Sequence, residues 1–550
     1  MEGHVFLLRG DLTKLYCDAW LMPTDRKLHV MRHWRMGVPG LRSDWKPSPP
    51  TDDWLNVARR VMEVKDWPVE EPRPWLVNTG AARGSRPVAW YTEGVRQFFE
   101  AVAPSIRQRR FTQNRAKPLV AVPLVGTGAG GAHNVAGNIV SSMLPTLYEA
   151  ASKWDLDIAL CVKEGPAYAA AVKARKAYAE KYPETRVWPR ELSDGLKAKA
   201  NKLAERARKK ELVLFLGAGV SAGAGLPAWE ELLKGLSQIA GIFPGTEDRD
   251  DSLRSAFRKL NYLDQARLIA DCFQERGLLI GEEVARIISQ RRHYAVSHAA
   301  LAVLPVVEVV TTNYDSLFEI ASQYAQDSKP RILPYDPAAP GNRWILKLHG
   351  CVNHPEDIVL TRSDYLRYDD RRAALKGIVQ ALLITRHMLF VGFSMTDDNF
   401  HRIIEEVRKA VRGDGRCMHC GSLDARDLGG GQETESQEKF GTVLSAAPNS
   451  FVQRLWDKDL DWFNFSDQET SEAYRLQEVF LDYLTSLSVS GTAYLMDSRY
   501  DDILSGGERR LRKELMNLVT RVEGDQEIRD TAAWQEFESL LQRFGKKDSL

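Results

Sequence analysis

The stretch Glu211–Glu230, ELVLFLGAGVSAGAGLPAWE, decides the fold of the central part of this chain. Its apolar run Leu212–Leu216 predicts a buried strand, and a helix is expected to open near Leu226. Between them, Gly217 and Gly219 permit a tight turn and a close approach of the backbone to a ligand. With alanine in the last position, the run fits G-x-G-x-x-G/A, the fingerprint of a dinucleotide-binding turn. The alternative is a glycine-rich turn that holds no ligand.

The whole chain has 550 residues, which is more than one hydrophobic core usually supports, so we expect about three domains. Basic and acidic residues nearly cancel, leaving a formal charge of +1. This balance argues against a nucleic-acid coat or a membrane-surface protein, and no apolar run reaches the roughly 18–20 residues of a membrane span. The start of the chain lacks a signal-segment pattern, and the six cysteines are scattered. We therefore expect a cytoplasmic protein in a reducing compartment.

From residue 1 to about 185, predicted strands alternate with predicted helices, one of them expected over Trp54–Val64, which is typical of an α/β sheet. GDLTKLYCDAW begins at Gly10, and PLVGTGAGG lies later in the same region. In this order, the two motifs resemble the macrodomain family. The resemblance implies that Asp11 binds the adenine of ADP-ribose. It also implies a loop whose backbone N–H groups cradle phosphates, formed by Gly126, Thr127, Gly128 and Gly130.

The N-terminal region departs from the macrodomain pattern at the end of its second predicted strand. The family has N-A-A-N there, contacting the distal ribose, whereas this chain has Met22-Pro23-Thr24-Asp25, with Asp25 at the second asparagine. This departure favours a nucleotide-sensing pocket over an ADP-ribose hydrolase. The alternative is a degenerate macrodomain that makes only protein contacts.

Three further apolar runs in the second half of the chain each end in polar residues or glycine. Thr311-Thr312-Asn313-Tyr314-Asp315 follows one run, His349-Gly350 follows the next, and Gly392-Phe393-Ser394 follows the third. Ligands bind at the carboxyl ends of strands in open parallel sheets, so together these runs predict one site. Considered alone, His349 fits equally well a histidine at a strand end whose hydrogen bonds are made within the protein and which has no catalytic role. Asn313 and Asp315 are equally a turn and helix cap.

These motifs, in this order, resemble the sirtuin family over about residues 208–485. The resemblance implies a Rossmann-like NAD site in which His349 holds the position of the catalytic base. It also implies that Asn313 meets the nicotinamide ribose or an attacking water, and that Asp315 meets the carboxamide. The NAD-binding residues that it implies are Gly217, Ala218, Gly219, Ser221, Thr312, Asp315, Gly392, Ser394 and Asp397.

Two departures separate this chain from deacylating sirtuins. Ala228-Trp229-Glu230 replaces the family's D-F-R, and only Cys417 and Cys420 form a C-x-x-C pair. A structural zinc needs four ligands, so we expect a strand over Arg416–Ser422 and no metal. With these departures and the S-x-x-D pattern that ends at Asp397, the chain resembles the prokaryotic sirtuin-like proteins of anti-phage defence, which hydrolyse NAD.

We therefore predict an α/β protein in four parts. These are a macrodomain-like nucleotide-sensing domain over 1–185, a helical linker over 186–210, a sirtuin-like NAD-cleaving domain over 211–488 and a helical C-terminal region over 489–550. The sirtuin-like part is expected to hold a Rossmann-like parallel sheet with a helical insertion.

The predicted function is NAD hydrolysis with release of nicotinamide, as an anti-phage effector that depletes NAD. We expect NAD as the substrate, an ADP-ribose-type nucleotide at the macrodomain-like pocket, a phage-derived activator and a homo-oligomer, with no membrane or direct nucleic-acid partner. Two alternatives stay open. One is an NAD-dependent protein deacylase or ADP-ribosyltransferase, and the other is a non-enzymatic nucleotide-binding scaffold.

Overall fold

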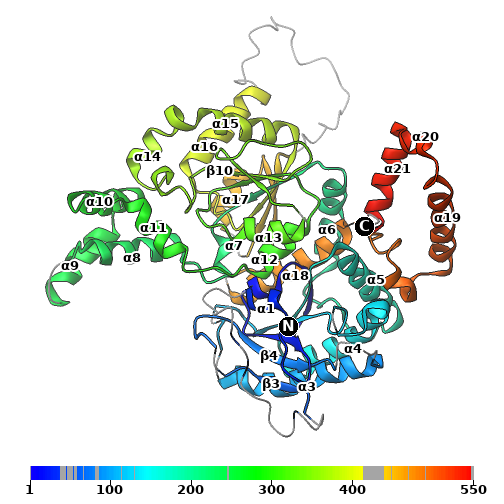
Figure 1. Cartoon of the computed structure of the whole chain (residues 1–550). Helices are drawn as coiled ribbons and strands as arrows, with labels where there is room; N and C mark the ends of the chain where they lie inside the picture. The colour runs from blue at the N-terminus through cyan, green and yellow to red at the C-terminus, as the bar shows by residue number, and fades with distance from the viewer. Residues whose placement is uncertain are drawn as a thin grey trace, which may run out of the picture.

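The structure is a computed structural model of the chain (Figure 1). It describes residues 2–36, 45, 47, 54, 59–65, 67–80, 86–108, 110–112, 114–128, 130–243, 247–326, 328–412, 439–446, 449–468, 470–489 and 491–546. The expected strand over 416–422, with Cys417 and Cys420, lies outside these residues.

The N-terminal domain is built on a six-stranded sheet in the order β1-β6-β5-β2-β4-β3. Its strands are β1 Val5–Arg9, β2 Ala19–Thr24, β3 Val61–Glu63, β4 Arg73–Asn78, β5 Leu119–Pro123 and β6 Asp157–Val162. Five of them run parallel, and β3 pairs antiparallel with β4. The prediction of a helix over Trp54–Val64 is wrong at β3, because pairing of Val61 with Val77 across the sheet overrides the local helical pattern.

Helices pack around this sheet and bury it. They are α1 Arg32–Met36, α3 Val88–Gln108, α4 Ala136–Trp154 and α5 Gly165–Lys181, with short 3-10 turns η1 Leu12–Lys14 and η2 His133–Val135. A linking helix, α6 Asp194–Arg208, follows. Its N-cap is Ser193, whose hydroxyl accepts from the Leu196 amide, as the sequence predicted.

The central domain holds a seven-stranded parallel sheet in the order β13-β12-β11-β7-β8-β10-β9. Its strands are β7 Leu212–Leu216, β8 Glu308–Thr311, β9 Arg331–Leu333, β10 Trp344–Lys347, β11 His387–Val391, β12 Gly441–Ser445 and β13 Leu460–Asn464. The chain leaves β7 toward β8 on one side and later returns to β11 on the other. The strand order therefore reverses beside β7, which is where open α/β sheets bind ligands.

Helices of the central domain fall into two groups. An insertion projects from the body at the left of Figure 1, and its apolar residues form one hydrophobic cluster with Tyr314, Ile358 and Leu360 of the body. It comprises α8 Trp229–Ala240, α9 Glu247–Arg258, α10 Tyr262–Glu275 and α11 Ile280–Ile288. The other helices are α7 Gly219–Ala222, α12 Val296–Val303, α13 Leu317–Ala325, α14 Arg362–Leu366, α15 Tyr368–Thr385, α16 Asp398–Arg412, α17 Ser450–Trp456 and α18 Ser471–Ser488.

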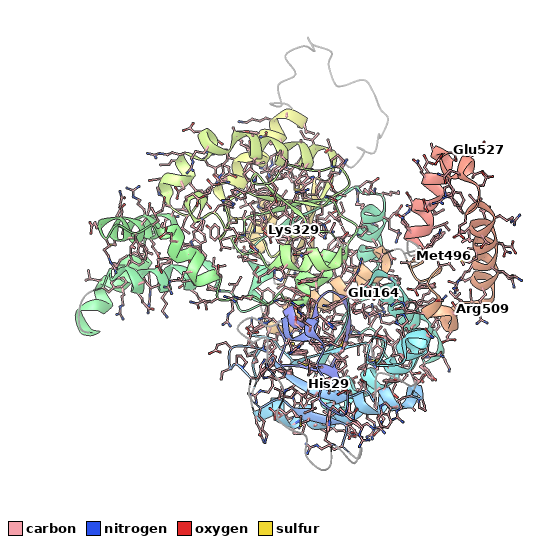
Figure 2. All side chains as sticks on the ribbon, in the orientation of Figure 1. His29, Glu164, Lys329, Met496, Arg509 and Glu527 are labelled. Carbon is pink, nitrogen blue, oxygen red and sulfur yellow. The ribbon has the colours of Figure 1, made fainter. Side chains whose placement is uncertain are left out.

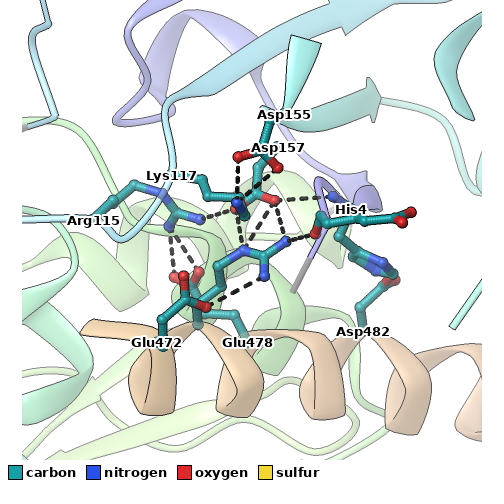
Figure 3. A network of polar contacts seen from close by, with 10 residues as sticks. His4, Arg115, Lys117, Asp155, Asp157, Glu472, Glu478 and Asp482 are labelled. Carbon is teal, nitrogen blue, oxygen red and sulfur yellow. Dashed lines mark hydrogen bonds and ion pairs between the residues drawn. The ribbon is translucent and has the colours of Figure 1, made fainter. Parts of the chain in front are cut away.

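A buried ionic network joins the two sheets through α18 (Figure 3). Asp157, at the start of β6, is fully buried and pairs with Arg475 at 2.7 Å and Arg115 at 3.1 Å. Arg115 also reaches Glu478 on α18. One hydrophobic core likewise runs from the N-terminal sheet through α12 and α18 to β7, so the two domains are packed as one body.

The C-terminal region forms a separate arm at the right of Figure 1. Its helices are α19 Gly506–Val522, α20 Gln526–Arg529 and α21 Ala532–Arg543, and the 3-10 segment η4 Ser498–Ile503, which packs on α4, precedes them. The predicted fold class is confirmed: two α/β sheets, the second fully parallel with a helical insertion, are followed by helices. Within the described residues, no helix is long and apolar enough to cross a membrane.

Candidate functional site

The glycine turn after β7 lies directly against the end of β11. The Gly217 amide donates to the Val391 carbonyl at 3.0 Å, and the Gly219 amide donates to the Gly392 carbonyl at 2.8 Å. A Cβ on Gly217 would stand 2.4 Å from the Gly392 oxygen. The turn therefore requires glycine because two strand-end loops cross there. The sequence predicted a tight turn and a close approach to a ligand, whereas the neighbour that requires glycine here is the backbone of Gly392.

The helix after this turn also begins differently from the expectation. One short turn, α7, comes first, and the longer helix α8 opens at Trp229 rather than near Leu226. The reason is local: Gly225 takes a positive φ of +76°, and the segment up to Ala228 stays extended. Leu226 and Pro227 instead form part of a cavity wall.

The Ser221 hydroxyl is the centre of a buried polar cluster. It donates to the Asp315 carboxylate at 2.9 Å and accepts from the Asn313 side-chain amide at 3.3 Å. Asp315 also accepts from the Leu317 amide, the first of α13, although the N-cap residue itself is Ser316. The hydroxyl of Ser221 thus positions the two polar residues that follow β8.

His298 on α12 completes the cluster, and sequence reasoning missed it. Its Nδ1 accepts from the Ala295 amide, so Nε2 carries the proton and donates to the Ser221 hydroxyl at 3.2 Å. Burial lowers the pKa of His298 to about 4, despite the nearby Asp315 carboxylate, so the ring is neutral at pH 7. No motif marked this residue, because it is a single histidine within an apolar helix.

Asn313 lines the cavity and has one side-chain polar atom without a partner among the described residues. Its side-chain nitrogen donates to the Gly217 carbonyl at 3.0 Å, and its backbone amide donates to Thr311. Its side-chain oxygen is buried and has no hydrogen-bond partner among the described residues. Because unpaired buried oxygens are costly, this acceptor is suited to a ligand hydroxyl or a water.

Lys347, on β10, holds the loop that carries Asn313. Its ammonium group is 1 % exposed and donates to the carbonyls of Asn313 and Asp315, at 3.2 and 2.5 Å. It also pairs with Glu319 at 2.5 Å. Sequence reasoning missed this residue, although a lysine inside the apolar run WILKLHG was a usable signal, since an unpaired lysine is rarely buried.

His349 lies buried at the end of β10, beside Tyr365 and Tyr368. Its Nε2 is 3.7 Å from Asp397 and has no hydrogen-bond partner in the part of the chain that the structure describes. Burial lowers the pKa of His349, while the Asp397 carboxylate raises it. The ring is therefore neutral near pH 7 and able to accept a proton.

Asp397 is held in place from two sides. It accepts from the Tyr365 hydroxyl at 2.8 Å and from the Phe400 amide at 2.9 Å, at the start of α16. Tyr365 lies on α14, so the carboxylate facing His349 is fixed by two helices. This support is suited to orienting the histidine ring.

These residues surround one cavity of about 480 Å³ at the switch point of the sheet. Helices of the insertion supply its apolar wall, including Trp229 and Leu263. The predicted site residues that line it are Ala218, Gly219, Ser221, Thr312, Asn313, Asp315, His349, Gly392, Ser394 and Asp397. Gly217 lies behind the wall. The structure thus brings the predicted residues together, while their binding of NAD stays a prediction.

A second cavity, of about 430 Å³, lies in the N-terminal domain. Asp25, Gly126, Thr127, Gly128 and Gly130 line it, as the sequence predicted for its pocket. Asp25 is engaged by His29, whose Nδ1 stands 2.7 Å from the carboxylate.

Asp11 lies next to this second cavity but is not among the described residues that line it. Its carboxylate accepts from the amide and hydroxyl of Thr13 and pairs with Lys163 at 2.8 Å. Lys163 lines the cavity in its place. Asp11 thus caps η1 and holds Lys163, and direct contact with adenine stays a prediction.

Residues 307–439 match the SIR2-like domain family. This part of the central sheet is therefore SIR2-like in sequence. The match begins at the strand before Asn313 and includes His349 and Asp397. The glycine turn precedes the matched residues, and the structure places it in the same sheet. Groups of three or more metal-ligating side chains do not occur in the described SIR2-like domain or elsewhere in the described chain.

Curated relatives match between about two fifths and one half of the chain. The NAD(+) hydrolase ThsA of Enterococcus faecium is 30 % identical over 288 residues, which are 50 % of this chain and 56 % of the relative. ThsA of Bacillus cereus is 28 % identical over 38 % of this chain and 43 % of its own length. Defense-associated sirtuin 2 of Bacillus subtilis is 25 % identical over 42 % and 22 %. The chain thus spans about half the length of the ThsA relatives.

Among solved structures, a macrodomain of Oceanobacillus iheyensis with ADP is similar to part of this chain. The match covers 33 % of this chain and 94 % of the macrodomain chain. The identity is 10 % and the TM-score 0.23.

Proposed function

We propose that this protein hydrolyses NAD, releases nicotinamide and acts in anti-phage defence by depleting NAD from the infected cell. One observation carries the proposal. A cavity at the switch point of the SIR2-like sheet holds an unpaired acceptor on Asn313 and an unpaired nitrogen on neutral His349. The NAD(+) hydrolases among its relatives support NAD as the substrate.

The two unpaired atoms are matched to hydrolysis. The bond between the ribose carbon and nicotinamide nitrogen breaks, nicotinamide leaves with the electron pair, and a water oxygen bonds to the carbon. The side-chain oxygen of Asn313 accepts a hydrogen bond from that water or from a ribose hydroxyl. His349 takes the proton that the water releases. The apolar wall from the insertion limits competing water in the cavity.

Turnover by the purified full chain tests this proposal. NAD loss and nicotinamide release are measured with and without ADP-ribose-type ligands and phage lysate. Release of nicotinamide without any acyl-lysine peptide or labelled protein is expected. Dependence on a peptide, or transfer of label to protein, would support the deacylase or transferase alternative instead. Tight NAD binding without turnover under every condition would support a scaffold.

Asp397→Asn tests the base role through pH. A base works when neutral, so activity is lost as pH falls through its pKa, which burial places below the ordinary histidine value of about 6.5. Removing the Asp397 carboxylate, which raises the pKa of His349, should move the acid limb of the kcat/KM profile to lower pH. It should also reduce kcat. Asp398→Asn, on the next residue of the same wall, is the control. Identical profiles in all three proteins would contradict the role of Asp397.

We also propose that the macrodomain-like domain regulates cleavage by binding an ADP-ribose-type nucleotide. The support is its second cavity, where the turn after β5 brings glycines to the carboxyl edge of the sheet. Gly126 has a φ of +87°, and a Cβ on Gly130 would stand 2.7 Å from Gly126, so both are required for the turn itself.

Gly128→Val is therefore the discriminating variant. A Cβ at Gly128 meets no described atom within 4 Å, so the side chain should enter the cavity without disturbing the turn. We expect loss of nucleotide-dependent regulation, loss of in-cell defence and an unchanged melting temperature. Intact defence and intact induced NAD loss would contradict a regulatory role for this cavity.

A further inference from the structure

The cavity of the N-terminal domain crosses the carboxyl ends of all five parallel strands. Its lining includes residues at or just after the ends of β1, β2, β4, β5 and β6. The glycine turn follows β5, in the middle of the row, with β6 and β1 on one side and β2 and β4 on the other. This arrangement suits an elongated ligand with phosphate at its centre and a larger group at either end.

The wall at the β1 and β6 end comes from a distant part of the chain. Arg499 and Tyr500 of η4 line the cavity together with Lys163 and Glu164, which follow β6. Tyr500 is 1 % exposed although it lies in the C-terminal region. Figure 2 labels Glu164 on the N-terminal domain and Met496 where the arm begins.

Arg499 anchors this wall by ion pairs. It contacts both oxygens of Asp497 at 2.6–3.0 Å and pairs with Glu164 at the start of α5. Burial alone would lower the pKa of Arg499, but its hydrogen bonds to Asp497 and Glu164 raise it, so the guanidinium is firmly charged. The charge of Arg499 is thus largely balanced by these two carboxylates.

Packing against α4 holds η4 on the domain. The position of a Cβ on Gly137 would be 3.1 Å from the Ile503 side chain and 3.4 Å from the Tyr500 backbone. A side chain at this position would be tighter than most Cβ contacts, so glycine favours the close approach of η4 to α4. The arm beyond is attached by Glu508 at the start of α19, which accepts from the Tyr494 hydroxyl at 2.7 Å and pairs with Lys173 on α5.

We propose that the C-terminal segment Asp497–Ile503 is a wall of the nucleotide site, and that a bound nucleotide contacts this wall at Tyr500 and fixes the arm. The inference rests on the proposed nucleotide-binding role of the N-terminal domain. It assigns a role to the C-terminal helices. Because η4 closes the cavity and directly precedes α19, binding of a nucleotide in the cavity is expected to restrain these helices. An aromatic ring beside apolar and charged groups suits one flat end of a nucleoside diphosphate that carries a second group.

Calorimetric titration of the full chain with ADP-ribose tests this inference. Tyr500→Ala removes the side chain that closes this wall and should weaken binding by about 10-fold or more. Tyr500→Phe keeps the ring and should bind like the wild type. In the wild-type chain, ADP-ribose should also slow amide hydrogen exchange in 497–503 and in α19. This second readout does not depend on how well the alanine variant folds.

The outcomes separate the two proposals. Binding to the wild type with equal affinity in Tyr500→Ala and no exchange protection in 497–503 would overturn the role of the segment while leaving the nucleotide site intact. Absence of ADP-ribose binding to the wild type would overturn the nucleotide site and this inference together. The proposal that the SIR2-like cavity cleaves NAD is tested separately and does not depend on either result.

Discussion

His349→Ala is expected to lower kcat for NAD cleavage by about 10²–10⁴-fold, the usual loss when a general base is removed. His349 is the histidine of the SIR2-like cavity with an unpaired, buried ring nitrogen, and its lowered pKa keeps it neutral and receptive at pH 7. Because the ring takes a proton only during reaction, NAD affinity should change far less than kcat. Nicotinamide release at saturating NAD, with calorimetric NAD binding beside it, measures both quantities.

His354→Ala is the matched control for this prediction. His354 lies five residues later, stacks on Tyr335 with ring centroids 3.8 Å apart, and does not line the described cavity. It should cleave NAD at the wild-type rate. An His349→Ala protein that folds, binds NAD and retains full turnover would contradict the assignment of the base and leave Asn313 as the first residue to test.

Asp157→Asn should destabilise the protein by about 3–5 kcal/mol, the cost of leaving buried charges without their partner. Asp157 is fully buried between Arg475 of α18 and Arg115, and it also accepts from the His4 amide at 3.0 Å. The asparagine keeps the shape but leaves two buried guanidinium groups short of a carboxylate. Thermal and urea unfolding, followed by circular dichroism, measure the loss.

Asp155→Asn is the control for this stability prediction. Asp155 lies two residues before Asp157 in the chain and pairs with Lys117, but its side chain is 63 % exposed. Asparagine tolerates the positive φ of 52° at this position. Its substitution should change stability by about 1 kcal/mol or less. Equal destabilisation by both variants would show that the buried network of Figure 3 contributes no more than a surface pair.

The network also predicts acid sensitivity. Burial alone would raise the pKa of Asp157, but Arg475 and Arg115 lower it below the usual aspartate value. A carboxyl group with a depressed folded-state pKa stabilises the fold above the unfolded-state pKa of about 3.9 and loses that contribution as pH falls further. The wild type should therefore lose more stability below about pH 4 than Asp157→Asn does.

The sequence alone determined that the chain has two α/β sheets, and it identified most residues of the candidate site. Strand β7 has the predicted bounds, because a run of apolar residues ended by glycine has few other solutions. Asn313, His349 and Ser394 were found from short motifs at strand ends, and parallel strands bring such ends to one edge. Local chemistry and the period of the chain were sufficient for these features.

Only the tertiary structure decided which groups support the site and how the domains are joined. His298 and Lys347 act through partners far away in the chain, and no local pattern encodes such contacts. The strand β3 exists because β4 lies beside it. Likewise, Tyr500 lines the N-terminal cavity although it lies more than 300 residues after the lining residues that the N-terminal domain supplies. Only packing in the assembled fold brings it there. Hydrophobic periodicity fixes which face of an element is buried, whereas the identity of its partner is set by three-dimensional packing.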